Sequence, residues 1–190
     1  MSRPAPPAGY VMVRERGVSI VALPFALQPV KTLVAEHGTL YTAAAAMPEA
    51  RAFRGRGDAF RVVVDGADIV VRHYRRGGAV ARLLGDRYVR LGAVRPAREL
   101  AASSAARTRG VPTPEIVCTV TYGHGAFYRA DIATRYVPDS RDLAEMVLGE
   151  ARVGDVGREA AWRAAGALLR RAFDAARKKK LQRHAPNSSN

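Results

Sequence analysis

A period-two pattern of apolar side chains begins at Phe60 and predicts a β-hairpin. Phe60, Val62 and Val64 alternate along one strand, and Asp68 to Tyr74 forms the returning strand. Asp65-Gly66 lies between the strands, and this dipeptide is typical of a tight hairpin turn. Successive side chains of a strand point to opposite faces of its sheet, so each face of the returning strand carries its own set of residues.

The returning strand separates two groups of side chains. One face receives the side chains at alternate positions Val70, Arg72 and Tyr74. The other face receives the intervening ones, Ile69, Val71 and His73. The face with Arg72 therefore carries the cation of this strand, and the strand continues into a basic, glycine-containing loop that starts at Arg75.

Other strands and helices are predicted before and after this hairpin. Further strands are expected at 11–23 with a turn at Gly17, at 116–122, and at 127–136. Helices are expected at 40–51 ending before Pro48, at 79–92 interrupted by Gly85, at 96–110, at 142–148 capped by Asp139 or Ser140, and at 155–173. The remaining residues, 177–190, are expected to be frayed and polar. Antiparallel hairpins combined with helices predict an α+β fold.

Composition restricts the class of protein. The chain has 190 residues, of which 48% are hydrophobic, enough for a packed core and against global disorder. The longest apolar run is interrupted at Pro24 and is shorter than the roughly 18 residues of a membrane span. No signal peptide is recognised at the N-terminus. Cys118 is the only cysteine, which excludes a disulfide framework and fits a reducing cytoplasm.

The net charge favours an anionic partner. The sequence has 31 basic and 17 acidic residues and a formal charge of +14. Nucleic acid, nucleotide phosphates and anionic lipid head groups are the candidate partners. An arginine-rich composition without functional meaning is the alternative. The basic residues are spread along the chain and form no zinc-finger or RNA-binding signature.

A glycine turn, a strand cation and a helix carboxylate follow one another in the order used by the nucleotide-binding lobe of a kinase. Gly55 and Gly57 allow a backbone to approach phosphates closely. Arg72 is the cation and Glu99, in the first turns of a helix, is its candidate partner. Each part alone has a structural alternative: a common turn, a solvated strand arginine and a surface helix charge. Their order and spacing favour the nucleotide-binding interpretation.

The amino-acid sequences of three long segments are more specific than this pattern. They read VVRHYRRGGAVARLLGDRYVRLG, RPARELAASSAARTRGVPTPEIV and FYRADIATRYVPDSRDLAEM. Together they resemble the Kdo kinases of Gram-negative bacteria, members of the lipopolysaccharide core kinase family and relatives of protein kinases. The resemblance covers roughly residues 50–175. It implies a protein-kinase-like N-terminal lobe, an antiparallel sheet plus one helix, followed by the first helices of a C-terminal lobe.

The resemblance also implies a division of the chain and a reaction. Residues 1–50 would be an N-terminal extension, 51–138 the nucleotide-binding lobe, and 139–190 an incomplete helical lobe with a basic polar tail. The enzyme would lie on the cytoplasmic side of the inner membrane as a peripheral protein and use ATP and Mg²⁺. It would phosphorylate the 4-hydroxyl of 3-deoxy-D-manno-octulosonic acid (Kdo) on a lipid A precursor, in lipopolysaccharide core biosynthesis.

Family roles carry over to several positions. Gly55 and Gly57 resemble the phosphate loop, Arg72 the phosphate-holding cation, for which most kinases have lysine, and Glu99 its partner. The expected adenine contacts are Val70 and the hinge from Tyr136 through Val137 to Pro138. The expected contacts to the anionic acceptor or to membrane head groups are Arg75, Arg76, Arg82 and Arg87. A solvated basic loop is the alternative for these four arginines.

The catalytic loop of the family is not recognised in this sequence. After the last predicted helix, His184, Asn187 and Asn190 resemble remnants of that loop, with Pro186 where Asp-Leu is expected. Asp174 lies within the helix and is a poor substitute for the missing Asp. We therefore expect a truncated, frameshifted or rearranged gene end, with no intact catalytic or metal-binding residue. An unrelated basic terminus is the alternative.

Three functional classes follow in order of preference. The first is a Kdo kinase whose activity is impaired in this chain. The second is a pseudokinase-like module that binds nucleotide or lipopolysaccharide precursor without turnover. The third is a nucleic-acid binder, which the arrangement of Gly55, Arg72 and Glu99 does not support. No nucleic-acid partner is expected.

Overall fold

The computed structural model describes residues 5–53, 58–75, 85–90, 92–123, 125–140 and 155–183. The chain divides into two compact units. The first comprises Met1–Ser104 with Pro114–Tyr136, and the second comprises Ala105–Thr113 with Val137–Asn190. The first unit combines an antiparallel sheet with helices, so the predicted α+β class is confirmed.

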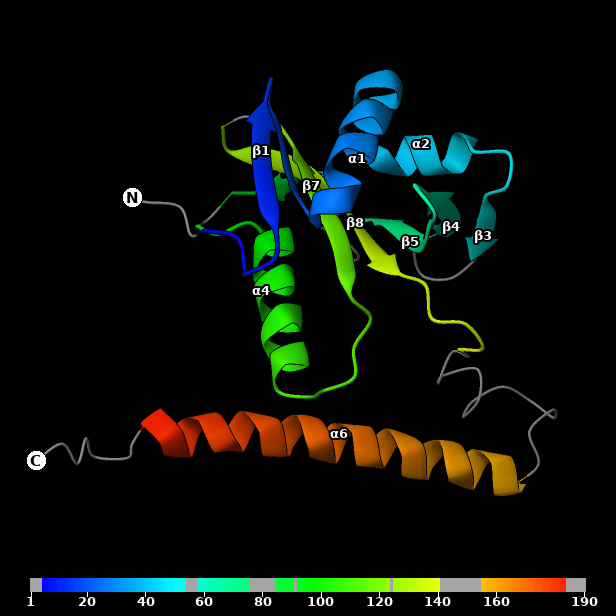
Figure 1. Cartoon of the computed structure of the whole chain (residues 1–190), viewed down its shortest axis with the longest axis vertical. Coiled ribbons are helices and arrows are strands. Elements are labelled where there is room, and N and C mark those ends of the chain that lie inside the picture. Colours follow the sequence, from blue (N-terminus) through cyan, green and yellow to red (C-terminus); the bar gives the residue numbers. More distant parts are fainter. Residues whose placement is uncertain are drawn as a thin grey trace, which may run out of the picture. The chain divides into compact units, whose positions relative to one another are not determined.

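The sheet of the first unit is antiparallel throughout (Figure 1). Its order is β1 (Val11–Glu15), β2 (Val18–Ala22), β7 (Ile116–Tyr122), β8 (Phe127–Arg135), β5 (Ala67–His73), β4 (Ala59–Val64) and β3 (Arg51–Phe53). A short strand, β6 (Tyr88–Val89), also pairs with β8. The first 50 residues therefore extend the same sheet, because β2 pairs with β7. The proposed boundary between extension and lobe stays a prediction.

Tight turns close the predicted hairpins where the sequence places them. Asp65 and Gly66 have φ of 49° and 72°, as a two-residue turn with two left-handed positions requires. They join β4 to β5 in the expected register, with Val64 opposite Ala67. The turn between β1 and β2 has the same character, because φ of Gly17 is 85°. The predicted strands at 11–23, 116–122 and 127–136 are confirmed.

Two helices cover one face of the sheet. α2 (Leu40–Ala46) is the alanine-rich helix expected before Pro48, and the Thr39 side chain caps its first turn. α1 (Pro24–His37) was not predicted, because Pro24 was interpreted only as a break in an apolar run. Proline is favoured in the first turn of a helix, where its missing N–H has no partner to lose, and here it begins α1.

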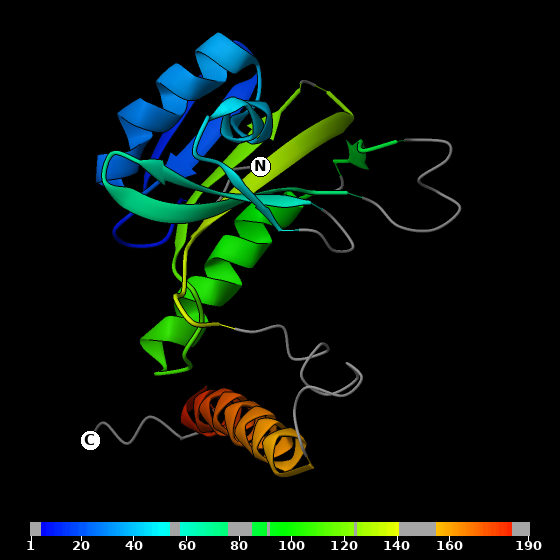
Figure 2. The same ribbon diagram turned by 90° about the vertical axis from the view of Figure 1, so that its right-hand side faces the viewer.

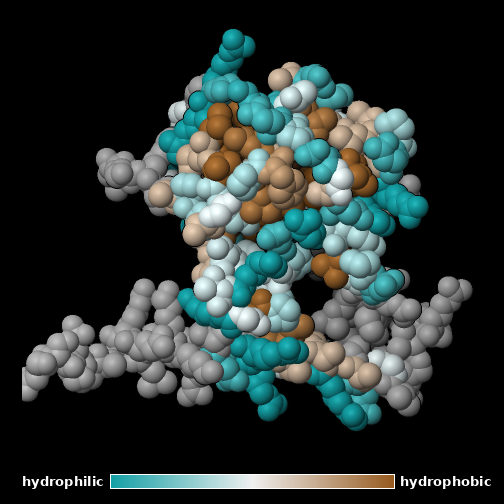
Figure 3. Space-filling view, in the orientation of Figure 1, coloured by the Kyte–Doolittle hydropathy of each residue, from teal (hydrophilic) through white to brown (hydrophobic). Residues whose placement is uncertain are grey.

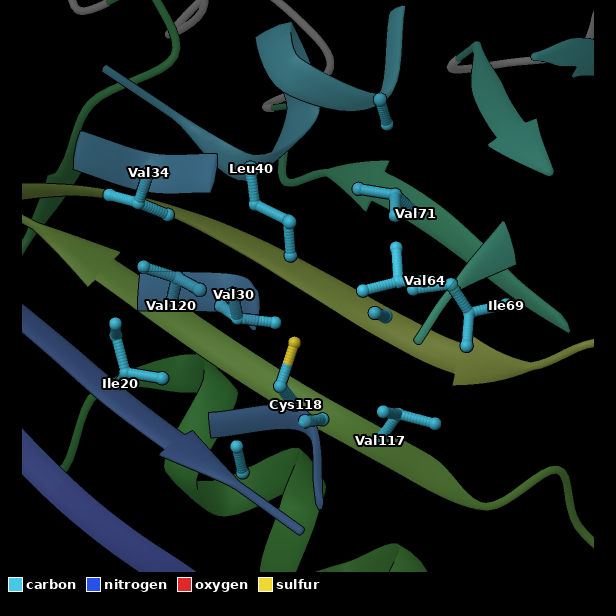
Figure 4. Packing of buried hydrophobic residues seen from close by; sticks show 14 of the residues in the cluster. Ile20, Val30, Val34, Leu40, Val64, Ile69, Val71, Val117, Cys118 and Val120 are labelled. Atoms are coloured by element: carbon cyan, nitrogen blue, oxygen red, sulfur yellow. The ribbon is translucent and has the colours of Figure 1, made fainter. Parts of the chain in front are cut away.

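The main core lies between these two helices and the sheet. Side chains from α1, α2, β2, β5 and β7 converge there, as Figure 4 shows for Val30, Leu40, Ile69 and Cys118 among others. Burial raises the pKa of the Cys118 thiol to about 12, so this cysteine is a packing residue and not a nucleophile at neutral pH. Outside this core, hydrophobic and hydrophilic side chains mix on the face that carries α1 and α2 (Figure 3).

α4 (Arg95–Thr108) begins on the other face of the sheet (Figure 2). Its buried Leu100 joins a second cluster with Ile132 and three tyrosines, Tyr74, Tyr88 and Tyr128. The helix matches the one predicted at 96–110, and φ of Gly110 is 73° just beyond its end. Residues 79–84 and 91 of the short helix expected at 79–92 lie outside the described residues, and Tyr88–Val89 within that range is a strand.

The second unit contains α6 (Asp155–Arg183). The sequence predicted that this helix ends near Phe173 and that residues 177–190 are frayed, but the helix continues through the lysine run to Arg183. Lysine, leucine, glutamine and arginine all favour helix, and no proline or glycine occurs between Phe173 and Arg183. The helix predicted at 142–148 lies outside the described residues. Ahead of it, the Ser140 hydroxyl donates to the carbonyl oxygen of Val137 at 2.8 Å.

Candidate functional site

β5 directs its side chains to two different environments. Ile69 and Val71 are buried in the core under α1 and α2, as the alternating pattern predicts. Arg72 points to the opposite face and its side chain is 51% exposed. Tyr74, two residues farther along the same face, is buried against α4. One strand thus supplies both core packing and an accessible cation.

The structure brings Arg72 and Glu99 together. Nη2 of Arg72 lies 3.8 Å from Oε1 of Glu99, which is ion-pair range but too long for a hydrogen bond. The other carboxylate oxygen, Oε2, accepts a 2.7 Å hydrogen bond from the Tyr74 hydroxyl. Glu99 is oriented because its neighbour Leu100 is buried in the second cluster. The predicted proximity of Arg72 and Glu99 is therefore observed, and the phosphate-binding role of this pair stays a prediction.

Tyr74 is a contributor that sequence reasoning missed. Burial raises the pKa of its hydroxyl, and the hydrogen bond to Glu99 raises it further. The hydroxyl is thus a permanent donor that fixes the Glu99 carboxylate. The signal was present in the sequence, because Tyr74 shares the strand face of Arg72. Its partner could be identified only once the helix was placed.

Three arginines surround a small pocket at this end of β5. The pocket has a volume of about 230 Å³ and is lined by Arg72, Arg75 and Arg95 together with Glu99 and Tyr74, among others. The Arg95 guanidinium lies over the Tyr74 ring, 5.2 Å from its centroid. Three guanidinium groups against one carboxylate make the pocket suited to an anion, and a guanidinium fork matches the oxygens of a phosphate.

The predicted hinge begins at Tyr136, whose backbone and ring both contact neighbouring strands. Tyr136 follows β8, and its backbone N–H donates to the carbonyl oxygen of Asp68 at 2.9 Å. The Arg61 guanidinium stacks on the Tyr136 ring at 3.7 Å from the centroid, and its Nε donates to Asp68 at 2.9 Å. This hydrogen bond is the main cause of a lowered pKa for Asp68. Phe53, at the end of β3, stacks with the same ring at 6.4 Å.

Some of the remaining predicted site residues lie within the described part of the chain, and others do not. Val70 is half-buried on the Arg72 face, Arg87 is exposed just before β6, and Val137 is exposed at the start of the second unit. The others, Gly55, Gly57, Arg76, Arg82, His184, Asn187 and Asn190, lie outside the described residues. We therefore retain as predictions the phosphate loop, the roles of Arg76 and Arg82 in the basic loop, and the possible catalytic remnant.

A buried carboxylate on the opposite face of β5 was not anticipated. Asp131 of β8 has no exposed surface. Its Oδ2 accepts hydrogen bonds from the Tyr122 hydroxyl at 2.7 Å and from the backbone N–H of Tyr41 at 2.9 Å. The Tyr122 oxygen in turn accepts from the backbone N–H of Leu40 at 2.8 Å. Asp131 therefore ties the start of α2 to two strands of the sheet.

His73 completes this network on the β5 side. Its Nδ1 lies 2.6 Å from Oδ1 of Asp131, and its Nε2 lies 3.1 Å from Oδ2 of Asp86. Both ring nitrogens thus face carboxylates, which favours the doubly protonated imidazolium. The hydrogen bond to Asp131 is the largest cause of a raised pKa for His73. A buried aspartate in a strand requires a hydrogen-bonding or charged partner. Asp131 was therefore the sequence signal that we missed.

We expect this network to make stability depend on pH. A base whose pKa is higher in the folded than in the unfolded chain stabilises the fold fully below its unfolded pKa, about 6.5 for histidine. That stabilisation is lost as pH rises through the folded pKa. The free energy of unfolding should therefore fall as pH increases above about 6.5. Urea titrations across this range test the prediction.

The His73→Gln variant is the control for this pH dependence. Glutamine does not titrate, so its unfolding free energy should change less with pH than that of the parent chain between about pH 6.5 and 8.5. The other groups near the imidazole are the Tyr41 ring at 5.7 Å and the arginines Arg75 and Arg129, which line the same pocket. Equal pH slopes for parent and variant would show that another group is responsible.

Among the described residues, histidines, cysteines and carboxylates form no cluster of three or more that would hold a metal ion. His73, Asp86 and Asp131 form a hydrogen-bonded chain in which each ring nitrogen of His73 faces one carboxylate.

Comparison with known proteins gives a consistent result. Residues 46–179 match the lipopolysaccharide kinase (Kdo/WaaP) family. The chain is 33% identical over 123 residues to a 3-deoxy-D-manno-octulosonic acid kinase of Photobacterium profundum, covering 64% of this chain and 50% of that protein. The kinase of the same name from Vibrio cholerae is 33% identical over 112 residues (55% and 47%), and that from Xylella fastidiosa strain 9a5c is 35% identical over 121 residues (62% and 45%).

The chain spans about half the length of these curated relatives. The match includes β4, β5, α4, β7 and β8, and therefore Arg72, Glu99 and the strand that precedes the predicted hinge. No solved structure is matched by the chain.

Proposed function

Because the chain belongs to the lipopolysaccharide kinase (Kdo/WaaP) family, we propose that its first unit is the nucleotide-binding lobe of a sugar kinase. The proposed reaction transfers the γ-phosphoryl group of ATP to the 4-hydroxyl of Kdo on a lipid A precursor, a step of lipopolysaccharide core biosynthesis. The names of the matched relatives support Kdo as the acceptor sugar. The choice of hydroxyl and of the lipid-linked acceptor follows from the resemblance of the sequence to Kdo kinases.

The observation that carries the proposal is the proximity of Arg72 and Glu99 beside a pocket lined by arginines. A kinase must hold the phosphates of its nucleotide with a fixed cation, which a carboxylate on a neighbouring helix positions. Arg72 supplies the cation from β5, and Glu99 supplies the carboxylate from α4. Arginine is larger than the usual lysine and offers two parallel donors, so it binds two phosphate oxygens at once.

The residues present fit a nucleoside triphosphate. The phosphates would lie against Arg72, Arg75 and Arg95, whose pocket has room for an anionic group. The adenine would lie toward Val70 and the hinge that begins at Tyr136. Backbone groups of the hinge would bind the base edge, and the predicted phosphate loop at Gly55 and Gly57 would cover the phosphates.

Phosphate transfer needs two further parts. A carboxylate must accept the proton of the attacking hydroxyl, and carboxylate or amide oxygens must hold magnesium. The described residues of the chain supply no such group at this pocket, since Glu99 is engaged by Tyr74 and Arg72. We therefore propose that these 190 residues bind nucleotide and transfer phosphate weakly or not at all. The alternative function is a pseudokinase-like module that binds nucleotide or lipopolysaccharide precursor without turnover.

We also propose that the basic surface meets an anionic membrane on the cytoplasmic side. Arg75 and Arg87 are accessible, and each basic residue near an anionic lipid surface contributes about 1 kcal/mol of attraction. None of the helices in the described part of the chain is long and apolar enough to cross a membrane. Binding to phosphatidylglycerol vesicles that weakens with added salt would support this peripheral location, and salt-independent binding would contradict it.

A transfer assay with labelled ATP tests the proposed function. The purified chain is incubated with γ-labelled ATP, magnesium and a Kdo-containing lipid A precursor, and lipid-linked label is measured beside a full-length relative. We expect nucleotide binding by the chain with far less transfer than the relative shows. Transfer at the relative's rate would contradict the proposed impairment, and absence of nucleotide binding would contradict the proposed lobe.

A further inference from the structure

Three buried tyrosines lie together where α4 begins. Tyr74 follows β5, Tyr88 belongs to β6 and Tyr128 to β8, and each is less than a tenth exposed. The rings of Tyr74 and Tyr88 meet edge to face at 6.4 Å, and those of Tyr88 and Tyr128 stack at 5.6 Å. We call these three residues the tyrosine cluster. It packs against Leu100 of α4, so it joins the sheet to this helix.

Tyr128 takes the part of a capping side chain at the start of α4. The first N–H groups of a helix have no partner within the helix. Val94, the residue before α4, has an apolar side chain that offers no acceptor. The Tyr128 hydroxyl oxygen accepts instead from the backbone N–H of Arg95 at 3.0 Å. A strand residue therefore fixes the point at which α4 begins.

The other two hydroxyl groups hold parts of the pocket lined by Arg72, Arg75 and Arg95, which we call the arginine pocket. Tyr74 donates to Oε2 of Glu99 at 2.7 Å, while Oε1 of the same carboxylate faces Arg72. Tyr88 donates to the backbone carbonyl oxygen of Arg75 at 3.0 Å. The tyrosine cluster thus contacts both the helix and the strand end that form this pocket.

The Arg95 side chain is held by the same rings. Its guanidinium lies 5.2 Å from the centroid of the Tyr74 ring and 6.0 Å from that of Tyr88. Its Nη1 also lies 3.5 Å from the Tyr88 hydroxyl oxygen. A guanidinium over an aromatic face is attracted to it. All of these contacts join groups of the chain itself, so they do not depend on a bound nucleotide.

We propose that Tyr74 and Tyr128 are positioning residues, which keep the start of α4 docked on the sheet with or without bound nucleotide. The pair of Arg72 and Glu99 is therefore assembled in advance. If α4 moved away from the sheet, only the fraction of molecules with an assembled pair would bind phosphates well, and the affinity would fall by that fraction. The phosphate-holding role of the pair rests on the proposed function.

Hydrogen exchange of backbone amides tests the docking of α4 without relying on nucleotide binding. In the purified chain, the amides of Arg98, Glu99 and Leu100 should exchange at least about a hundredfold more slowly than in an unfolded chain. Saturating magnesium-ATP should change these rates by less than about threefold, because the helix is already docked. Tyr128→Phe should speed exchange by about tenfold or more, since it removes the acceptor at the start of the helix.

The Thr39→Ala variant is the matched control for loss of a cap. The Thr39 side chain accepts from the backbone N–H of Thr42 at 3.0 Å and so caps α2, a different helix. This variant should leave exchange at the start of α4 within about threefold of the parent rate.

The affinity for ATP tests whether docking acts through the pair. Tyr74→Phe should raise the Kd for ATP by about fivefold or more, because Glu99 is no longer held opposite Arg72. In the Arg72→Met background the same change should alter the Kd by less than about twofold, since the pair is already absent. Tyr122→Phe removes a buried hydroxyl that donates to a different carboxylate, Asp131, and should leave the Kd within about twofold.

Three results would overturn the proposal. They are equal exchange at the start of α4 in Tyr128→Phe and Thr39→Ala, a slowing of that exchange by ATP of about threefold or more, and an equal effect of Tyr74→Phe on ATP binding with and without Arg72. Failure of the proposed function would look different. ATP binding by the parent chain would then be missing, while exchange at the start of α4 remained slow and sensitive to Tyr128→Phe.

Discussion

The Asp131→Asn variant is expected to unfold about 3 kcal/mol more easily than the parent chain. Asp131 is fully buried, and its Oδ1 lies 2.6 Å from Nδ1 of His73. Asparagine has almost the same shape, so the variant removes the charge without leaving a cavity. One carboxylate oxygen also becomes an NH₂ donor, which faces either His73 or the Tyr122 hydroxyl. The loss should be measured by urea unfolding at pH 6, where His73 is protonated.

Two further variants separate the contributions within this network. Tyr122→Phe removes one hydrogen bond to a charged acceptor and should cost about 1.5 to 3 kcal/mol. The double variant His73→Gln/Asp131→Asn removes both charges, so it should be less destabilised than the sum of the two single variants. A loss below about 1 kcal/mol for Asp131→Asn would contradict the stabilising role assigned to this buried network.

The Arg72→Met variant is expected to lose most of the affinity for ATP. Methionine keeps an apolar stem of similar length and removes the guanidinium that we assign to the phosphates. Hydrogen bonds to charged groups contribute about 1.5 to 3 kcal/mol, which corresponds to a roughly tenfold to one-hundred-fiftyfold higher Kd. The side chain is half exposed, so the fold should be retained. A fluorescent ATP analogue displaced by unlabelled ATP gives the affinities.

Two controls make this prediction specific. Arg72→Lys restores a cation of the kind that most kinases use, and its Kd should stay within about tenfold of the parent value. Arg14→Met removes the same charge at the far edge of the sheet and should leave the Kd unchanged. If Arg14→Met and Arg72→Met weakened ATP equally, the effect would come from net charge, and Arg72 would have no special position.

Local signals in the sequence were sufficient to predict most of the strands. The turn Asp65-Gly66 fixes the hairpin of β4 and β5, and through it the faces of Arg72 and His73. Pro96 and Gly110 bracket α4 and so place Glu99 in its first turns. The proximity of Arg72 and Glu99 follows from these two local features once the helix packs on the sheet.

Features that depend on distant residues were not predictable in this way. Asp131 meets His73 only because β8 pairs with β5, and Tyr41 reaches it only because α2 packs on that face. β6 consists of two residues, and its pairing with β8 defines it more than any local pattern. α1 was missed because Pro24 both ends an apolar strand and begins a helix, and its sequence alone does not distinguish these roles.

Calorimetric titration of the purified chain with ATP, ADP, AMP and adenosine tests the central claim most directly. The claim is that the first unit holds a nucleotide by its phosphates, against Arg72 and the neighbouring arginines. We predict saturable binding of one ATP per chain, with affinity decreasing in the order ATP, ADP, AMP and no measurable binding of adenosine. Adenosine binding as tight as that of ATP, or no binding of ATP, would contradict the account.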